Sequence, residues 1–251
     1  MDWALLPPLW IWLVVAAPFI GSFLGVVVTR AESPQSILWG RSACAHCNHR
    51  LEPWDLLPIV SWLVLRGRCR HCGERVSAFY LVIELAALVV AVWSAVIASG
   101  WLMVASSVLG WALLALALID VRSFLLPDFL TLPLIGCGLL VTAALDPSTT
   151  VFHVLGAAIG FLAIVAIRQA YWILRGREGI GLGDAKLMAA AGAWVSWEGL
   201  PSVVLVAALG GLTGALLQHY LRATIHLTDR IAFGAFLCVG IWLVWLYGPL
   251  V

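Results

Sequence analysis

Two aspartates lie where apolar runs end or begin, which are positions where charged residues are scarce. Asp120 ends the run LALALID, and Asp184 closes GIGLGD just before an alanine-rich stretch. Acidic residues near a bilayer are costly to place and are functional candidates by default. Two carboxyl groups in close contact cannot both ionise readily, so one stays protonated and the other charged. Such a pair suits hydrolysis, in which the charged member takes a proton from water and the neutral member polarises a carbonyl.

Simpler roles are open for the same acids. Asp184 would serve as an N-cap for a helix over 185–198, a role that aspartate fills well. Asp120 would pair with Arg122, and Asp128 would cap the helix that follows Pro127. Residue types alone therefore leave both a catalytic pair and a structural role open.

The glycines before Asp184 favour a functional role. Gly179, Gly181 and Gly183 let a backbone approach closely, as an extended substrate requires. The stretch is not a phosphate loop, because no strand precedes it and the G-K-[ST] ending is absent.

Four of the six cysteines form two C-x-x-C pairs separated by 21 residues, namely Cys44, Cys47, Cys69 and Cys72. Paired C-x-x-C in a reducing compartment is typical of metal binding, and four thiolates complete a tetrahedral shell around structural Zn²⁺. Redox dithiols and inert cysteines are the alternatives. A neighbouring histidine (His46, His49 or His71) is an alternative ligand, and Cys137 and Cys238 fall in apolar runs as small buried hydrophobes.

The rest of the chain must hold these residues in a bilayer. The 251 residues are 63% hydrophobic and only 11% charged, whereas soluble domains carry about 25% charged residues. Runs of suitable length predict an all-α integral membrane protein with about eight transmembrane helices. The expected spans are 5–28, 79–98, 101–119, 129–145, 151–173, 186–198, 202–221 and 231–248. The first run lacks a basic leader and is long enough to span, so we expect it to stay as a helix.

The basic residues predict the orientation. With the N-terminus and C-terminus outside, the inside segments 29–78, 120–128, 168–185 and 222–230 contain all 13 arginines, and Lys186 lies at their edge. This arrangement obeys the positive-inside rule. Both aspartates then lie near the cytoplasmic face. We expect three parts: a first helix (1–28), a zinc-binding cytoplasmic loop (29–78) and a polytopic core (79–251).

Several motifs in order resemble the prepilin peptidases, also called type IV leader peptidases. GSFLGVVVTR resembles the opening stretch of that family, and CAHC, LLPIVSWLVLRGRCRHC and SAFYLVIE resemble its cytoplasmic loop and second span. IDVRSFLLPDFLTLP and GIGLGDAKLMAAAGAW resemble its two catalytic segments, and IAFGAFLCVG its closing span. The resemblance covers nearly the whole chain.

The resemblance implies a GxGD-type membrane aspartic peptidase of the bacterial inner membrane. Its substrates are type IV prepilins or type II secretion pseudopilins, cut at the cytoplasmic face, and many members then N-methylate the new terminus with S-adenosylmethionine. Asp120 and Asp184 match the catalytic positions, and the four paired cysteines match the zinc ligands. Asp128 and Lys186 match motif positions as supporting residues, together with Gly181 and Gly183.

The sequence departs from the family pattern at three places. Gly25 stands where asparagine is typical, Ala232 and Ala235 replace common prolines, and Thr29-Arg30-Ala31 replaces a Tyr-Arg-Leu run. We expect none of these positions to touch the aspartates, so the departures should bear on the methyltransferase activity more than on the peptidase activity. No Rossmann-type fingerprint gives independent support for S-adenosylmethionine binding.

Two other function classes are a transporter and a catalytically silent assembly scaffold, and the intact aspartate pair argues against the scaffold. A transporter would use Asp120, Asp184 and Glu84 as an ion relay, but such proteins often contain inverted repeats and midplane acids, and no repeat is apparent here. A nucleic-acid partner is not expected, because the membrane topology already accounts for the arginines of the cysteine loop.

Overall fold

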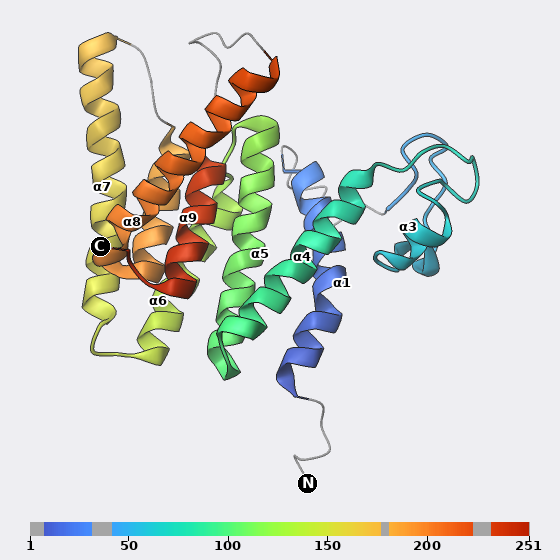
Figure 1. Cartoon of the computed structure of the whole chain (residues 1–251), viewed down its shortest axis with the longest axis horizontal. Helices are drawn as coiled ribbons and strands as arrows, with labels where there is room; N and C mark the ends of the chain where they lie inside the picture. The colour runs from blue at the N-terminus through green and yellow to red at the C-terminus, as the bar shows by residue number, and fades with distance from the viewer. Residues whose placement is uncertain (1–7, 32–41, 177–180, 223–231, 251) are drawn as a thin grey trace. The chain divides into compact units, whose positions relative to one another are not determined.

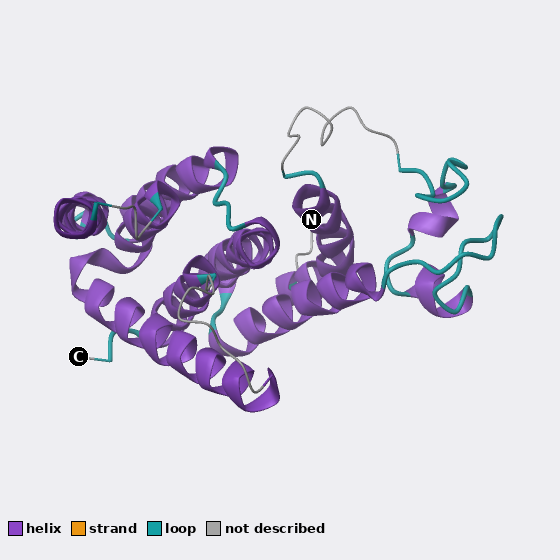
Figure 2. Ribbon diagram, turned by 90° about the horizontal axis from the view of Figure 1, so that it is seen from above, coloured by secondary structure: helices purple, strands orange, loops and turns teal. Residues whose placement is uncertain are grey.

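The computed structural model describes residues 8–31, 42–176, 181–222 and 232–250. Within these ranges every regular element is a helix, and strand pairing is limited to two isolated β-bridges (Figure 2). The predicted all-α membrane fold is therefore confirmed. The chain divides into two compact units, Met1–Ala115 and Leu116–Val251, each described by itself. The three-part division at residues 28 and 78 stays a prediction.

Six helices are long and apolar enough to cross a membrane. They are α1 (Leu9–Thr29), α4 (Ala78–Ile97), α5 (Gly100–Ser123), α6 (Asp128–Leu145), α7 (Thr150–Arg175) and the Leu182–Leu217 part of α8 (Leu182–Arg222) (Figure 1). A seventh, α9 (Phe233–Tyr247), is apolar but shorter. The loop between α1 and α4 contains the 3-10 helix η2 (Pro53–Leu56) and the short helix α3 (Val60–Val64).

All eight expected spans fall on these helices, but the sixth and seventh both belong to α8. The break between them lies at Ser196, whose φ of 64° and ψ of 176° are not helical. Pro201 follows in the next turn and has no N–H to donate to the carbonyl of Trp197, which limits regular hydrogen bonding there. α5 also runs one turn beyond the expected span, so Asp120 lies inside the helix and not in a loop.

In the first unit, α1 packs closely on α4 through two glycines four residues apart. A Cβ added to Gly21 would lie 2.6 Å from the Cα of Glu84, and one added to Gly25 would lie 3.1 Å from the Tyr80 ring. Small residues at this spacing let membrane helices approach closely. Gly25, where the family resemblance leads us to expect asparagine, is therefore a packing residue in this chain.

In the second unit, α7 and α8 also meet backbone to backbone. A Cβ on Gly160 would collide with the carbonyl of Met188, and a Cβ on Gly192 would collide with the carbonyl of Gly156. This contact fixes the first turns of α8, where Asp184 lies.

Trp194 joins α8 to α6 and α9. Its side chain is fully buried, and its indole N–H donates to the carbonyl of Leu134 at 2.9 Å. The ring lies against Gly138 and meets Trp245 edge to face, with centroids 5.0 Å apart. Because buried indole N–H groups need an acceptor, this bond fixes the rotation of α8 about its axis.

We predict that Gly192→Ala destabilises the protein, because the new methyl has no space against α7. Overpacking of this kind costs about 1–3 kcal/mol, so the melting temperature in detergent should fall by several degrees. Gly136→Ala in α6 is the matched control, since nothing lies within 4 Å of its Cβ position. Equal melting temperatures for the two variants would contradict the packing described.

Candidate active site and metal centre

Asp120 is a buried carboxylate that faces the start of another helix. It lies in the last turn of α5 with 5% of the residue exposed, and its Oδ2 accepts the backbone N–H of Ala235 at 2.9 Å. Ala235 is in the first turn of α9, where N–H groups have no partner within the helix. Proline has no N–H, so alanine at this position supplies a bond that the proline expected from the resemblance cannot make. The expectation that none of the family departures touches the aspartates is therefore wrong for Ala235.

Gly234 allows α9 to approach this close. A Cβ there would lie 2.9 Å from Oδ2 of Asp120 and 3.1 Å from Cδ1 of Leu126. Any larger residue would push α9 away from the carboxylate.

Asp184 lies in the first turn of α8, because the helix begins at Leu182 and not after Asp184. It is half-buried, and its carboxylate accepts the backbone N–H of Gly181. An acidic side chain in a helix's first turn commonly reaches back to bond a free N–H in this way. The alternative of Asp184 as an N-cap residue is therefore wrong, although it stabilises the same helix end.

The two carboxyl groups come close enough to interact electrostatically. Leu126, in the link between α5 and α6, lies against a glycine beside each of the two carboxyl groups. A Cβ on Gly183 would lie 2.9 Å from Cβ of Leu126, and Gly234 meets the same side chain. The second unit thus gathers Asp120, Asp184 and the two glycines around Leu126.

The supporting residues pair with each other. Nζ of Lys186 lies 2.5 Å from Oδ1 of Asp128, the first residue of α6. The pair joins the link that contains Leu126 to the helix that carries Asp184. Gly179, the remaining glycine of the motif, lies outside the described residues.

Leu126, Gly234, Ala235 and Cys238 were not identified from the sequence. Cys238 is buried in α9 and lies within electrostatic range of both aspartates. The small buried hydrophobe expected at this position is observed, but it lies beside the carboxylate pair. The same expectation for Cys137 is wrong, because Cys137 is exposed. The sequence contained one signal of the contact between α9 and the carboxylate pair, which is the glycine Gly234 at the start of an apolar helix.

In the first unit the four paired cysteines form one cluster. Their Sγ atoms all lie within 4.8 Å of one another, and those of Cys44 and Cys72 are 3.9 Å apart. A tetrahedron with Zn–S bonds of about 2.3 Å has edges of about 3.8 Å. The cluster is therefore sized to hold a thiolate-binding metal ion. The three nearby histidines are not part of the cluster.

The two C-x-x-C turns are repeats of one another. In each, the first cysteine's N–H donates to the carbonyl five residues on, and its own carbonyl accepts the N–H four residues on. Each turn is closed by an antiparallel bridge, Ala43 with Arg50 and Arg68 with Arg75. The sequences CAHCNHR and CRHCGER match in the pattern C-x-H-C-x-x-R, a short repeat that the sequence analysis missed.

Both cysteine turns also contain one residue with a positive φ, at the same position. Asn48 and Gly73 follow the second cysteine of each pair with φ of 54° and 71°. Asparagine and glycine are the residues that adopt this conformation most easily.

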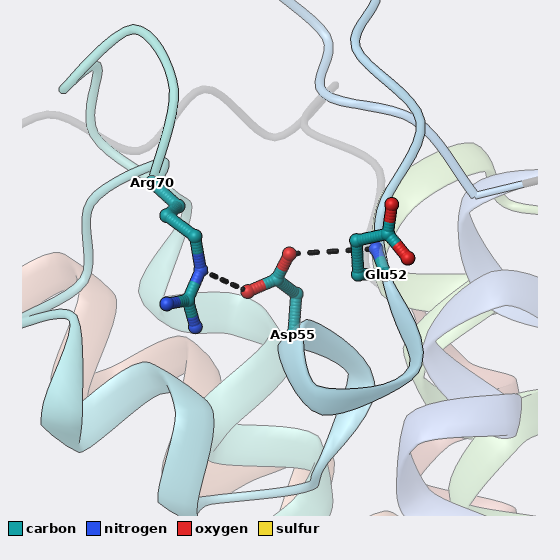
Figure 3. Close-up of polar contacts among 3 residues, drawn as sticks. All are labelled: Glu52, Asp55 and Arg70. Atoms are coloured by element: carbon teal, nitrogen blue, oxygen red, sulfur yellow. Dashed lines mark hydrogen bonds and ion pairs between the residues drawn. The ribbon is translucent and has the colours of Figure 1, made fainter.

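An ion pair fixes η2 against the second turn. Nε of Arg70 lies 2.8 Å from Oδ1 of Asp55, whose other oxygen accepts the N–H of Glu52 at 3.4 Å (Figure 3). Only 5% of the Asp55 side chain is exposed. The segment between the two cysteine pairs is thereby attached to the cluster.

The surroundings shift the pKa values of two cysteines of the cluster in opposite directions. Backbone N–H groups of Cys47 and His46 point at Cys44 and lower its pKa to about 6. The N–H of Glu74 favours the Cys72 thiolate, but desolvation and the neighbouring thiols outweigh it and raise the pKa of Cys72 to about 12. Four adjacent thiolates therefore require a bound cation for full ionisation.

The fold and the aspartates together define a polytopic helical membrane protein with a pair of carboxyl groups buried among its helices. Two family models match the chain: the bacterial peptidase A24 N-terminal domain over residues 15–98 and the type IV leader peptidase family over residues 107–217. The chain belongs to the type IV leader peptidase family.

Curated relatives support this membership. A prepilin leader peptidase/N-methyltransferase of Aeromonas hydrophila is 37% identical, with 91% of this chain and 87% of the relative aligned. Proteins of the same name from Burkholderia pseudomallei (strain 1026b) and Pectobacterium carotovorum subsp. carotovorum are 38% and 35% identical. These alignments cover 90% and 95% of this chain, and 82% and 94% of the relatives. No solved structure matches the chain.

We predict that the cluster binds one tetrahedrally coordinated ion. The purified protein should contain about one metal ion per chain, and Cys44→Ser/Cys72→Ser should contain almost none. Cys137→Ser is the control, because Cys137 lies in α6 outside the cluster. Metal content is measured by elemental analysis. Equal metal in the double variant and the wild type would contradict the assignment.

Proposed function

We propose that this protein is an aspartic endopeptidase of the inner membrane that removes the leader peptide from type IV prepilins or type II secretion pseudopilins. The carboxylate pair of Asp120 and Asp184 supports this proposal most directly, in a chain that belongs to the type IV leader peptidase family. The names of the curated relatives support the substrate class.

The proposed chemistry uses the pair as a unit. The charged carboxylate takes a proton from a water molecule, whose oxygen attacks the scissile carbonyl carbon. The neutral carboxyl donates a hydrogen bond to the carbonyl oxygen as negative charge develops there. Proton transfer to the leaving nitrogen then breaks the C–N bond. The proton is shared by the pair and belongs to neither residue alone.

Neighbouring groups keep the pair in position. Asp120 is held by the N–H of Ala235, and Asp184 by the N–H of Gly181. Gly181 is exposed, and only Asp184 and Gly183 lie near its Cβ position. We infer that this open backbone receives the extended junction between leader and pilin, as a glycine strip without side chains permits.

The proposed orientation follows the basic residues. With both termini outside, the ends of α5 and α7 and the start of α8 lie on the cytoplasmic side. The leader of the substrate would be cut there, while its apolar helix stays in the bilayer beside the spans.

Methylation of the new N-terminus is the second proposed step. The curated relatives are named for both activities. S-adenosylmethionine would supply the methyl group to the deprotonated amine, with its S–CH3 bond broken and S-adenosylhomocysteine as the leaving group. No residue of this chain is assigned to that cofactor.

Zn²⁺ is the proposed ion of the cysteine cluster, with Cys44, Cys47, Cys69 and Cys72 as its ligands. The thiolate set and the tetrahedral spacing favour it. Its role would be structural, because four cysteines leave no open position for substrate.

No observation favours the transporter alternative. Glu84, one of its three proposed relay acids, accepts the backbone N–H of Ile59 at 2.7 Å in the first unit. That bond gives the residue a structural role.

We predict that Asp120→Asn and Asp184→Asn each lower the rate of leader cleavage at least about a hundredfold, because neither amide can exchange the proton. Cleavage of a purified prepilin is followed by mass shift. Both variants should keep their metal and melting temperature. Methyl transfer to a pre-cleaved pilin, measured with labelled S-adenosylmethionine, should be unchanged. Wild-type cleavage by either variant would refute the proposed pair.

We predict that Lys186 and Asp128 position the site jointly. The pair is partly exposed, with 28% and 58% of the side chains accessible, so breaking it should cost at most about 1 kcal/mol of stability. Misplacing Asp184 by about 1 Å should reduce kcat ten- to a hundredfold.

The test compares Lys186→Met and Asp128→Asn with the exchanged pair Lys186→Asp/Asp128→Lys. The single variants should lose kcat at near-normal KM, and the exchange should recover much of it. If the exchanged pair is as slow as the single variants, or the single variants are fully active, the pair does not act as described.

A further inference from the structure

The loop between α1 and α4 has an exposed apolar surface that is not part of any membrane-spanning helix. It consists of Trp54, Leu56, Leu57, Val60, Leu63 and Val64, and we call it the α3 surface. Each of these residues is at least 43% exposed, and Val64 reaches 72%. Soluble surfaces rarely gather so many large apolar side chains, and such patches mark protein or membrane contacts.

The α3 surface lies beside a membrane helix and not at a distance from it. The N–H of Ile59, just before α3, donates to Oε2 of Glu84 at 2.7 Å. Glu84 is six residues into α4, about 9 Å along the axis from Ala78 at 1.5 Å per residue. The loop backbone therefore reaches the depth of the second turn of a membrane span.

The backbone at Ile59 is bent to make this contact. Its φ is 62° and its ψ is −53°, the rare γ-turn conformation, which is closed by the N–H of Val60 donating to the carbonyl of Pro58. Such a conformation persists only where its surroundings hold it. The bond to Glu84 holds Ile59 in this conformation, and it fixes the orientation of α3, which begins at the next residue.

Basic residues gather beside the α3 surface. Trp62, Arg66, Arg68 and Arg75 line an open cleft of about 540 Å³, together with Ser77 and Ala78 at the start of α4. Among the described residues, no acidic side chain forms an ion pair with these three arginines. Nε1 of Trp62 is buried and has no acceptor. Three cationic groups at one cleft, with no acidic partner in the described part of the chain, call for an anionic ligand.

We propose that the α3 surface lies in the plane of the membrane interface and that the cleft binds the phosphate of an anionic phospholipid. The apolar side chains enter the acyl boundary, and the arginines meet the headgroup. Interfacial elements combine these two features in the same way. The proximity to α4 and the charge of the cleft favour lipid over a protein partner. This inference is independent of the proposed peptidase activity.

A photocrosslinking experiment tests the placement. The full-length protein carries p-benzoylphenylalanine at Val64 and is placed in nanodiscs of equal parts phosphatidylcholine and phosphatidylglycerol. Val64 should yield phospholipid adducts by mass spectrometry, whereas the same probe at exposed Ala45 in the first cysteine turn should not. Crosslinks from Val64 to peptides of residues 116–251, or no lipid adduct, would overturn the proposal.

A second measurement tests the cleft. Retention of phosphatidylglycerol is compared for wild type, Arg66→Gln/Arg75→Gln and the control Arg50→Gln, with metal content and melting temperature as folding checks. Each cleft arginine removed should weaken phosphatidylglycerol binding about fivefold, and Arg50→Gln should bind as wild type does. Unchanged binding by the double variant, or displacement of the lipid by S-adenosylmethionine, would show that the cleft serves another ligand.

Discussion

Mutual repulsion between Asp120 and Asp184 is the constraint that organises the second unit. Two neighbouring carboxyl groups in a region of low dielectric stay in place only if hydrogen bonds from the protein replace the water that they lose. The helices meet this requirement at several points. α9 brings the N–H of Ala235 to Asp120, α8 brings that of Gly181 to Asp184, and Leu126 fills the space between their glycines. The close contact of α7 with α8 then keeps the first turn of α8 from moving.

Glycines make close contact possible both between the backbones of α7 and α8 and beside the two carboxyl groups. Gly156, Gly160 and Gly192 allow the α7 and α8 backbones to touch, beginning at Met188, one turn after Asp184. Gly234 and Gly183 do the same beside the site. In a membrane, where lipid is as apolar as leucine, such close packing carries much of the association between helices. The second unit is thus rigid where its chemistry requires fixed distances.

The sequence predicted what depends on composition and local spacing. Because bilayer thickness imposes a length that single helices must meet, hydropathy located the six helices that are long and apolar enough to span, although it divided α8 into two. The C-x-x-C spacing indicated the four-cysteine cluster, since each pair is a local turn. Contacts across the chain were not predictable in this way. Ala235 reaches Asp120 over more than a hundred residues, and Ile59 reaches Glu84 through a backbone angle unusual for isoleucine. The break at Ser196 was also misplaced, because no proline or glycine occupies that position.

The repeated cysteine turns bear on the order of events during synthesis. Each turn is closed by its own backbone bonds, so the first presents two thiolates before the second exists. Cys72 precedes Ala78, the start of α4, by only six residues. The ligand set is therefore complete on the emerging chain before α4 has left the ribosome. Metal capture can precede insertion of the second span, and the closed loop then delivers Ile59 to Glu84 as that helix enters the bilayer.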